Sequence, residues 1–167
     1  MKLFKKMSVV GAVLGCLFIG SNAFAQGGNT ASDTGTATAS VIGSLSMVNN
    51  EDMDFGEGIQ GDAAKTVFPL IAGRAYFGVS GEALRFYNVT APADGVVVMT
   101  TGGGGANETI AVDSWNFYSG GANSASHGQI GLGGSDQLFL GATRAALGAA
   151  QVPGAYSGDY TVTVVYQ

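Results

Sequence analysis

The sequence predicts an all-β protein built as a sandwich of two antiparallel sheets, and three observations support this. Val, Phe, Tyr and Ile occur in short runs, and Gly, Asn, Asp and Ser separate these runs. Glycine is abundant at 28 residues, while only 3 prolines occur among the 167 positions. Alternation of apolar and polar residues is clear near both ends of the predicted domain, whereas helical spacing is rare. Many short strands joined by turns suit two packed antiparallel sheets better than parallel strands linked by helices.

The first 25 residues are typical of a secretory signal peptide. Lys2, Lys5 and Lys6 precede an apolar run at 7–20, and the small-x-small sequence Ala-Phe-Ala follows at 23–25. The apolar run is shorter than the roughly 20 residues that span a bilayer. We therefore expect residues 1–25 to be removed and the mature chain to be exported without a membrane span.

The single cysteine, Cys16, lies within this predicted signal peptide. The sequence Val-Leu-Gly-Cys at 13–16 resembles a lipoprotein cleavage box, so lipidation at Cys16 is an alternative to cleavage after Ala25. Cleavage after Ala25 would leave a chain without thiols, and disulfides, thiol catalysis and Cys-ligated metals would then be excluded.

The predicted mature chain is strongly acidic. Its basic residues are Lys65, Arg74, Arg85 and Arg144, against 12 acidic residues. Such a balance argues against binding to a phosphate backbone, and we expect no nucleic-acid partner. Mutual repulsion and solubility before assembly are the simpler consequences.

The chain after the signal peptide begins with a polar stretch and continues into a strand. Residues 26–35 are small and polar, so we expect a flexible N-terminal extension. Residues 36–48 then show the clearest alternation, with one apolar face and one face of Ser and Thr, which predicts a strand with one dry face. The apolar face consists of Ala37, Ala39, Val41, Gly43, Leu45 and Met47. The predicted sandwich domain covers residues 36–167.

Further strands follow in short segments of Val, Phe, Tyr, Ile and Thr. They are predicted at 53–55, 65–71, 75–80, 84–91, 96–101, 109–112, 137–140 and 160–166. One stretch, 138–150, is rich enough in Ala and Leu to form a helix, but Gly141 and Gly148 favour a loop or a single turn there.

The C-terminus has the most specific pattern in the sequence. Its apolar side chains alternate with Thr and Val after a glycine-containing lead, and they are Tyr160, Val162, Val164 and Tyr166. The pattern resembles the subunits of chaperone–usher pili, whose last strand follows a glycine and ends in a penultimate tyrosine. Gly154 and Tyr166 occupy these positions. The internal segments MDFGEGIQG, YFGVSGEALRFYNVTAP and VPGAYSGDYTVTVVYQ are similar to bacterial secreted pilin-like domains and to spore coat protein U.

This resemblance implies an immunoglobulin-like (pilin-like) sandwich that forms a homopolymer by donor-strand addition, with a periplasmic chaperone and an outer-membrane usher as further partners. Many such subunits contain a disulfide and a bulky N-terminal donor, whereas here residues 26–35 offer only Ala31 as an apolar residue. The candidate donor is therefore the strand at 36–48. Its predicted subunit contacts are Val41, Gly43, Leu45 and Met47, with Gly43 placed for a close backbone approach.

Four other segments contain residues of types found in catalytic or binding sites. His127 lies in a polar loop without a recognisable Ser-His-Asp arrangement, which favours a solvated histidine. The acidic stretch at 51–57 lacks the residue order of a helix-loop-helix calcium site, which favours a solvated turn. The glycine run at 100–105 lacks the Lys-Ser/Thr of a phosphate loop. Trp115 and Phe117 share one face of a segment, where core packing is favoured over a subunit contact or a sugar platform.

We therefore expect no catalytic residue, no metal site and no cofactor, and hence no enzyme. The function that the residues favour is a structural subunit of an extracellular fibre, pilus or fimbrium at the cell surface, with adhesion or biofilm formation as the implied role. The alternative is a monomeric or coat-forming secreted adhesin that binds carbohydrate, in which the strand at 36–48 completes the subunit's own sheet.

Overall fold

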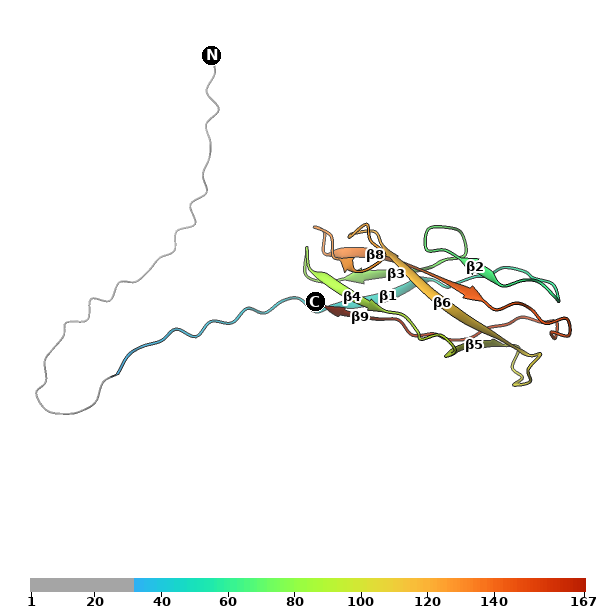
Figure 1. Cartoon of the computed structure of the whole chain (residues 1–167). Coiled ribbons are helices and arrows are strands. Elements are labelled where there is room, and N and C mark those ends of the chain that lie inside the picture. Colours follow the sequence, from blue (N-terminus) through green and yellow to red (C-terminus); the bar gives the residue numbers. More distant parts are fainter. Residues whose placement is uncertain (1–31) are drawn as a thin grey trace, which may run out of the picture. The chain divides into compact units, whose positions relative to one another are not determined.

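The computed structural model describes residues 32–167 (Figure 1). The predicted signal peptide and residues 26–31 of the predicted extension lie outside the described residues. The chain divides into two units at Ala39 and Ser40. In the first unit, residues 32–39 are exposed and contain no assigned strand. The second unit, Ser40–Gln167, contains the folded domain.

The folded domain consists of strands and loops, and the described residues contain no helix. The strands are β1 (Ser46–Glu51), β2 (Lys65–Val67), β3 (Ala75–Ser80), β4 (Phe86–Thr90), β5 (Val97–Thr100), β6 (Thr109–Ser119), β7 (Gly128–Gln129), β8 (Ser135–Arg144) and β9 (Thr163–Tyr166). No helix in this part of the chain could therefore cross a membrane.

The strands form two sheets, and every pairing is antiparallel. The large sheet has six strands in the order β1-β3-β8-β6-β5, with β2 also paired to β8. The small sheet has three strands in the order β7-β4-β9. The predicted all-β fold of two antiparallel sheets is confirmed.

Individual strands differ from the prediction where the backbone departs from a plain alternation. β3 matches its predicted range. β6 is longer than predicted and continues through Trp115. A bulge between Asp113 and Asn116, with Ser114 at φ 54°, shifts the register of β6 on β8 and interrupts the alternation there. Segment 53–55 is not a strand. The interpretation of 138–150 as a loop or turn is wrong up to Arg144, which ends β8.

Gly141 explains why β8 was misjudged from the sequence. The Val67 carbonyl of the paired β2 region, the Pro69 ring and the Asn116 side chain all crowd the position where a Cβ on Gly141 would lie. Any larger residue would collide with this backbone, so the glycine marks a close approach within the sheet rather than its end.

The core has two parts. In the first, Phe77 and Val79 of β3 and Leu138 of β8 pack with Tyr87 of β4 and Val162, which leads into β9, so both sheets contribute. The second contains Phe55 together with large-sheet residues only, namely Val67, Val97, Val112 and Ala142. The small sheet therefore covers the large sheet at one end, and at the other end segments without regular strands lie over it.

A buried carboxylate joins the two sheets at the first core. Asp136 of β8 is 5% exposed, and its Oδ2 accepts hydrogen bonds from the Tyr87 hydroxyl at 2.6 Å and the Ser119 hydroxyl at 2.5 Å. Its Oδ1 accepts from the backbone N–H groups of Gly121 at 2.5 Å and Gln137 at 2.6 Å. A buried carboxylate is tolerated when its oxygens are satisfied in this way.

We expect Tyr87→Phe to lower the free energy of unfolding by about 1.5–3 kcal/mol, because it removes a hydrogen bond to a charged group between the sheets. Urea unfolding followed by near-UV circular dichroism measures this change. Tyr118→Phe is the matched control, because it removes the hydroxyl of a half-buried tyrosine on the face of β6 that points away from the core. It should lower the free energy of unfolding by less. An equal decrease in the free energy of unfolding in both variants would show that the Tyr87–Asp136 hydrogen bond does not stabilise the domain more than an ordinary tyrosine hydroxyl does.

The domain should also lose stability in alkali. Burial, with the hydrogen bond and charge of Asp136, raises the pKa of Tyr87 well above its ordinary value. Burial, with the charge of Asp52, raises the pKa of Tyr160 to about 12. An unfolded tyrosine ionises near pH 10, so this stabilisation is complete below about pH 10 and is lost as the pH rises from about 10 towards 12.

Urea midpoints measured at intervals from pH 8 to pH 12 test this expectation. The midpoint should fall above about pH 10, and Tyr160→Phe should make the fall shallower, because one of the two tyrosines is then absent. A midpoint that stays level across this window would contradict the assignment of both buried phenols.

Candidate functional site

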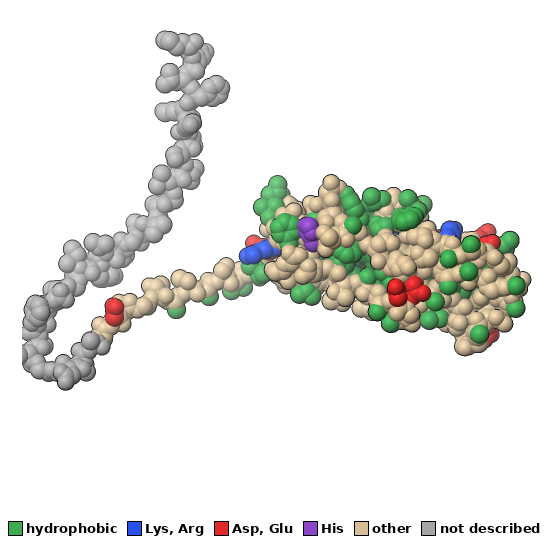
Figure 2. All heavy atoms as spheres, in the orientation of Figure 1, with side chains coloured by type: hydrophobic (Ala, Val, Ile, Leu, Met, Phe, Trp, Pro, Cys, Tyr) green, Lys and Arg blue, Asp and Glu red, His purple; other side chains and the backbone are tan. Residues whose placement is uncertain are grey.

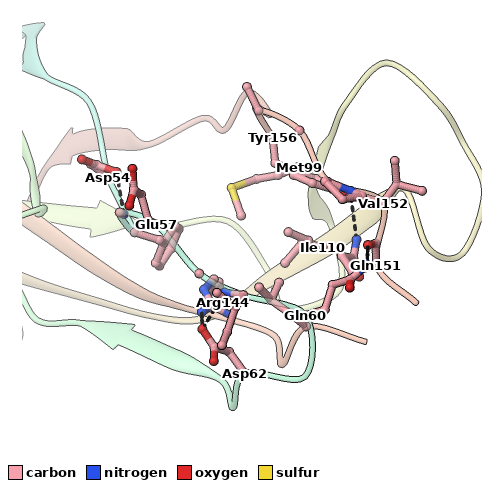
Figure 3. A pocket seen from close by; sticks show the side chains of 18 of the residues that line it. Asp54, Glu57, Gln60, Asp62, Met99, Ile110, Arg144, Gln151, Val152 and Tyr156 are labelled. Carbon is pink, nitrogen blue, oxygen red and sulfur yellow. Dashed lines mark hydrogen bonds and ion pairs between the residues drawn. The ribbon is translucent and has the colours of Figure 1, made fainter. Parts of the chain in front are cut away.

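A cleft of about 1140 Å³ opens at the end of the large sheet that the small sheet leaves uncovered (Figure 3). Residues of 53–60 line one part of it and residues of 151–156 line another. Met99 of β5, Ile110 of β6 and Arg144 of β8 also line the cleft, and Figure 3 shows Met99 beside Tyr156 and Arg144 beside Asp62. The cleft thus exposes the inner face of the large sheet.

The apolar part of the cleft continues into the second core. Phe55 is 8% exposed and belongs to that core, and Met53 and Met99 pack against it while also lining the cleft. Ile59 and Val152, on the two flanking segments, are 74% and 38% exposed. Apolar side chains that stay in contact with water at the margin of a core form a surface that can gain stability by being covered.

Polar side chains hold the flanking segments in place at one end of the cleft. Arg144 is 5% exposed, and its guanidinium donates to the carbonyls of Ala63 at 3.3 Å and Ala145 at 3.0 Å, with Asp62 at 3.9 Å. Gln60 Nε2 donates to the Gln151 carbonyl at 2.5 Å, which ties the two segments together. All of these polar groups bind partners within the chain, so their role at this end of the cleft is to hold the two flanking segments in place.

Few backbone groups of the two flanking segments take part in hydrogen bonds. Within the described residues, 55–58 and 153–156 make no hydrogen bond from backbone to backbone. One N–H in this region is satisfied locally, because the Gly56 N–H donates to Asp54 Oδ1 at 2.6 Å. Irregular segments whose backbone groups lack a backbone partner, beside an apolar floor, offer groups to which an incoming strand can bind.

The predicted donor residues fall into two groups. Val41 is 96% exposed, and the Gly43 N–H donates to Glu82 Oε2 at 3.1 Å. Leu45 packs against the first core, and Met47 pairs with Val79 as part of β1 and also packs there. The structure therefore places the last residues of the predicted donor in the subunit's own sheet, and only the stretch before β1 is without a strand partner.

The residues of the predicted C-terminal motif come together as the alternation indicated. Val162 is buried, and Val164 and Tyr166 pair with Val89 and Tyr87 of β4. Tyr160 packs against Trp115, with ring centroids 4.9 Å apart. Gly154 lies elsewhere, in the lining of the cleft. The motif thus connects the first core with the cleft.

His127 and the glycine run at 100–105 both make contacts within the domain. The His127 ring packs edge-on against Phe86, with centroids 5.3 Å apart, and its Nδ1 lies 3.0 Å from the Ser126 hydroxyl. In the glycine run, the Gly105 N–H donates to Glu108 at 3.0 Å. No group of three or more His, Cys, Asp or Glu side chains within residues 32–167 could hold a metal ion. Figure 2 shows few charged side chains on the face in view.

Sequence reasoning missed the cleft because nothing in the sequence links its two walls. Residues 53–60 were expected to contain a strand and an acidic turn, and 150–156 a loop before the last strand. Glycines on both walls, Gly56 and Gly154 among them, were a usable signal, since glycines beside a core permit close approach of another backbone.

No curated protein is significantly similar to this chain. A family described as "Domain of unknown function (DUF4402)" matches residues 68–166. The match begins just after β2 and extends into β9, so it includes the wall of the cleft at 151–156 and most of the large sheet. Because it covers more than half of the chain, this protein belongs to the DUF4402 family.

Proposed function

We propose that the protein is a structural subunit of an extracellular fibre, in which the arm before β1 of one copy adds as a strand to the cleft of the next. The observation that supports this proposal is the cleft itself. It combines an apolar floor around Met99 and Ile110 with two walls, 55–58 and 153–156, that make no hydrogen bond from backbone to backbone.

An incoming strand would both cover the apolar floor and give the backbone groups of the walls a partner. Its backbone would pair with the N–H and C=O groups of 55–58 or 153–156, and every second side chain would descend towards the floor. Covering the floor would also remove exposed apolar surface, including Ile59 and Val152, which otherwise favours aggregation. A second copy is a suitable source because each chain carries an extended, unpaired stretch at 32–45.

The arm, residues 32–45, contains few large apolar side chains, and this limits the affinity of its contact with the next subunit. Val41 would contribute about 1.5–3 kcal/mol if fully buried, and each backbone hydrogen bond about 0.5–1.5 kcal/mol. Leu45 and Met47 already stabilise their own subunit. Backbone pairing rather than side-chain anchoring would therefore supply most of the affinity, and ordering the arm would oppose it.

Repeated addition of one copy to the next is a heterologous contact and produces an open fibre rather than a closed ring. The role is structural rather than enzymatic. Export through the predicted signal peptide, a position at the cell surface, adhesion or biofilm formation, and assistance by a chaperone and an usher belong to this proposal.

The proposal can be tested by filling the cleft. Ala155 is exposed and lines it, so Ala155→Trp should occupy the space that the arm would take and reduce polymer formation by at least about tenfold. Ala106→Trp places the same ring in an exposed loop outside the cleft and is the matched control. Sedimentation velocity over a range of concentrations, with negative-stain images, measures the polymers.

A synthetic peptide of residues 32–45 provides the complementary test. In excess it should block polymerisation of the unmodified protein, while a scrambled peptide should not. Polymers that form equally well from Ala155→Trp, or a wild-type protein that stays monomeric at every concentration and binds no peptide, would refute the proposal.

A further inference from the structure

Three aromatic side chains form a row across the outer face of the large sheet. Tyr76 of β3 pairs with Phe139 of β8, and Phe139 pairs with Tyr118 of β6. The rings of Tyr76 and Phe139 lie 5.3 Å apart at their centroids and are inclined by 35°. All three residues are partly exposed, whereas their strand neighbours Phe77 and Leu138 are buried in the core on the opposite face.

Cross-strand aromatic pairs stabilise sheets, so such a row alone is no evidence for a binding site. The side chains around it add a second observation. The Arg74 guanidinium lies 4.8 Å from the centre of the Phe139 ring. It makes one long hydrogen bond, of 3.4 Å, to the Ile71 carbonyl, and within residues 32–167 no carboxylate pairs with it.

Arg74 differs from Arg85, the other arginine without a carboxylate partner in the described part of the chain, in that its guanidinium lies over an aromatic ring. Its guanidinium carries five N–H donors, and a single long hydrogen bond leaves most of them available to oxygen atoms of a ligand. A cation held over an aromatic ring is at the same time fixed in position. Arg74 is therefore a positioned donor at one side of the row.

Carboxamides border the row on its other side. Gln137 is exposed, lies opposite Gly78, and donates to the Tyr76 hydroxyl at 3.3 Å. The exposed Asn50 places its Nδ2 3.0 Å from the position that a Cβ on Gly78 would take. The absence of a side chain at Gly78 leaves room for the Asn50 amide over that position.

We propose that this face binds a glycan, with a pyranose ring stacked on the row of Tyr76, Phe139 and Tyr118 and its hydroxyls bonded to Arg74, Gln137 and Asn50. A sugar with equatorial hydroxyls has an apolar C–H face and a polar edge. The row supplies flat apolar rings, and the guanidinium and amides supply donors and acceptors around them. A β-linked glucan has this geometry at every residue.

The competing explanation is contact between copies of the protein. Phe68 and Leu70, in the loop between β2 and β3, are 57% and 61% exposed and would extend an apolar interface. They do not account for Arg74 and the two carboxamides, which would lose water without a known partner if a protein surface covered them. The glycan uses these groups, and for this reason we favour it.

Affinity electrophoresis tests the proposal. The exported protein is run in native gels containing hydroxyethyl cellulose as the neutral probe or polygalacturonate as the anionic one. Retardation by hydroxyethyl cellulose is expected, and Arg74→Gln should weaken it about tenfold. Arg85→Gln is the matched control, because Arg85 is an exposed arginine on another part of the domain and its loss should change nothing. A stronger effect of Arg74→Gln with polygalacturonate would show that Arg74 also binds carboxylates.

Phe139→Val gives the second variant, since valine keeps the β propensity of the position while removing the ring. It should abolish retardation while its circular dichroism stays that of the wild type. Measuring the same variants in the Ala155→Trp background separates this proposal from the fibre, because glycan binding by single subunits does not need assembly. The proposal is overturned if neither polysaccharide retards the wild-type protein, or if Phe139→Val changes only its state of association.

Discussion

The small sheet is too narrow to cover the large one, and this mismatch determines where the core is closed. At one end Tyr87 and Val162 reach across to Phe77 and Leu138, and the interior is sealed. At the other end the inner face of the large sheet meets Tyr160 and the segments 53–60 and 151–156, and the cleft opens there. The buried Asp136 lies in the sealed part, where its hydrogen bond to Tyr87 joins the two sheets and its hydrogen bond to Ser119 joins β8 to β6 within the large sheet.

The sequence predicted those features that depend on neighbouring residues. The strand predicted at 75–80 agrees with β3, and the alternation predicted from Tyr160 onward agrees with the burial of Val162 and the pairing of β9, although β9 itself begins only at Thr163. The bulge in β6 breaks the alternation after Val112, and Gly141 imitates a loop within β8, so these strands were predicted too short. Such errors arise because tertiary contacts, here the Val67 carbonyl over Gly141, override local preference.

The two candidate sites could not be predicted in the same way. The walls of the cleft are far apart in the sequence, and the aromatic row joins Tyr76, Tyr118 and Phe139 from three separate strands. Only the pairing of β3, β8 and β6 brings these rings together. The aromatic cluster at 115–118 illustrates the difficulty, because Trp115 and Phe117 pack towards the core while Tyr118 faces outward.

Glu82 fixes the root of the arm to the C-terminal strand. Its carboxylate accepts the Gly43 N–H, and its own N–H donates to the Tyr166 hydroxyl at 2.6 Å. Figure 1 places this C-terminal end of β9 at the opposite end of the folded domain from β5, which contributes Met99 to the cleft. In the proposed fibre, tension would enter each subunit at one end and leave it at the other, along the strands. Hydrogen bonds between antiparallel strands lie across that direction, so a pull would load many of them at once in shear instead of opening them one after another.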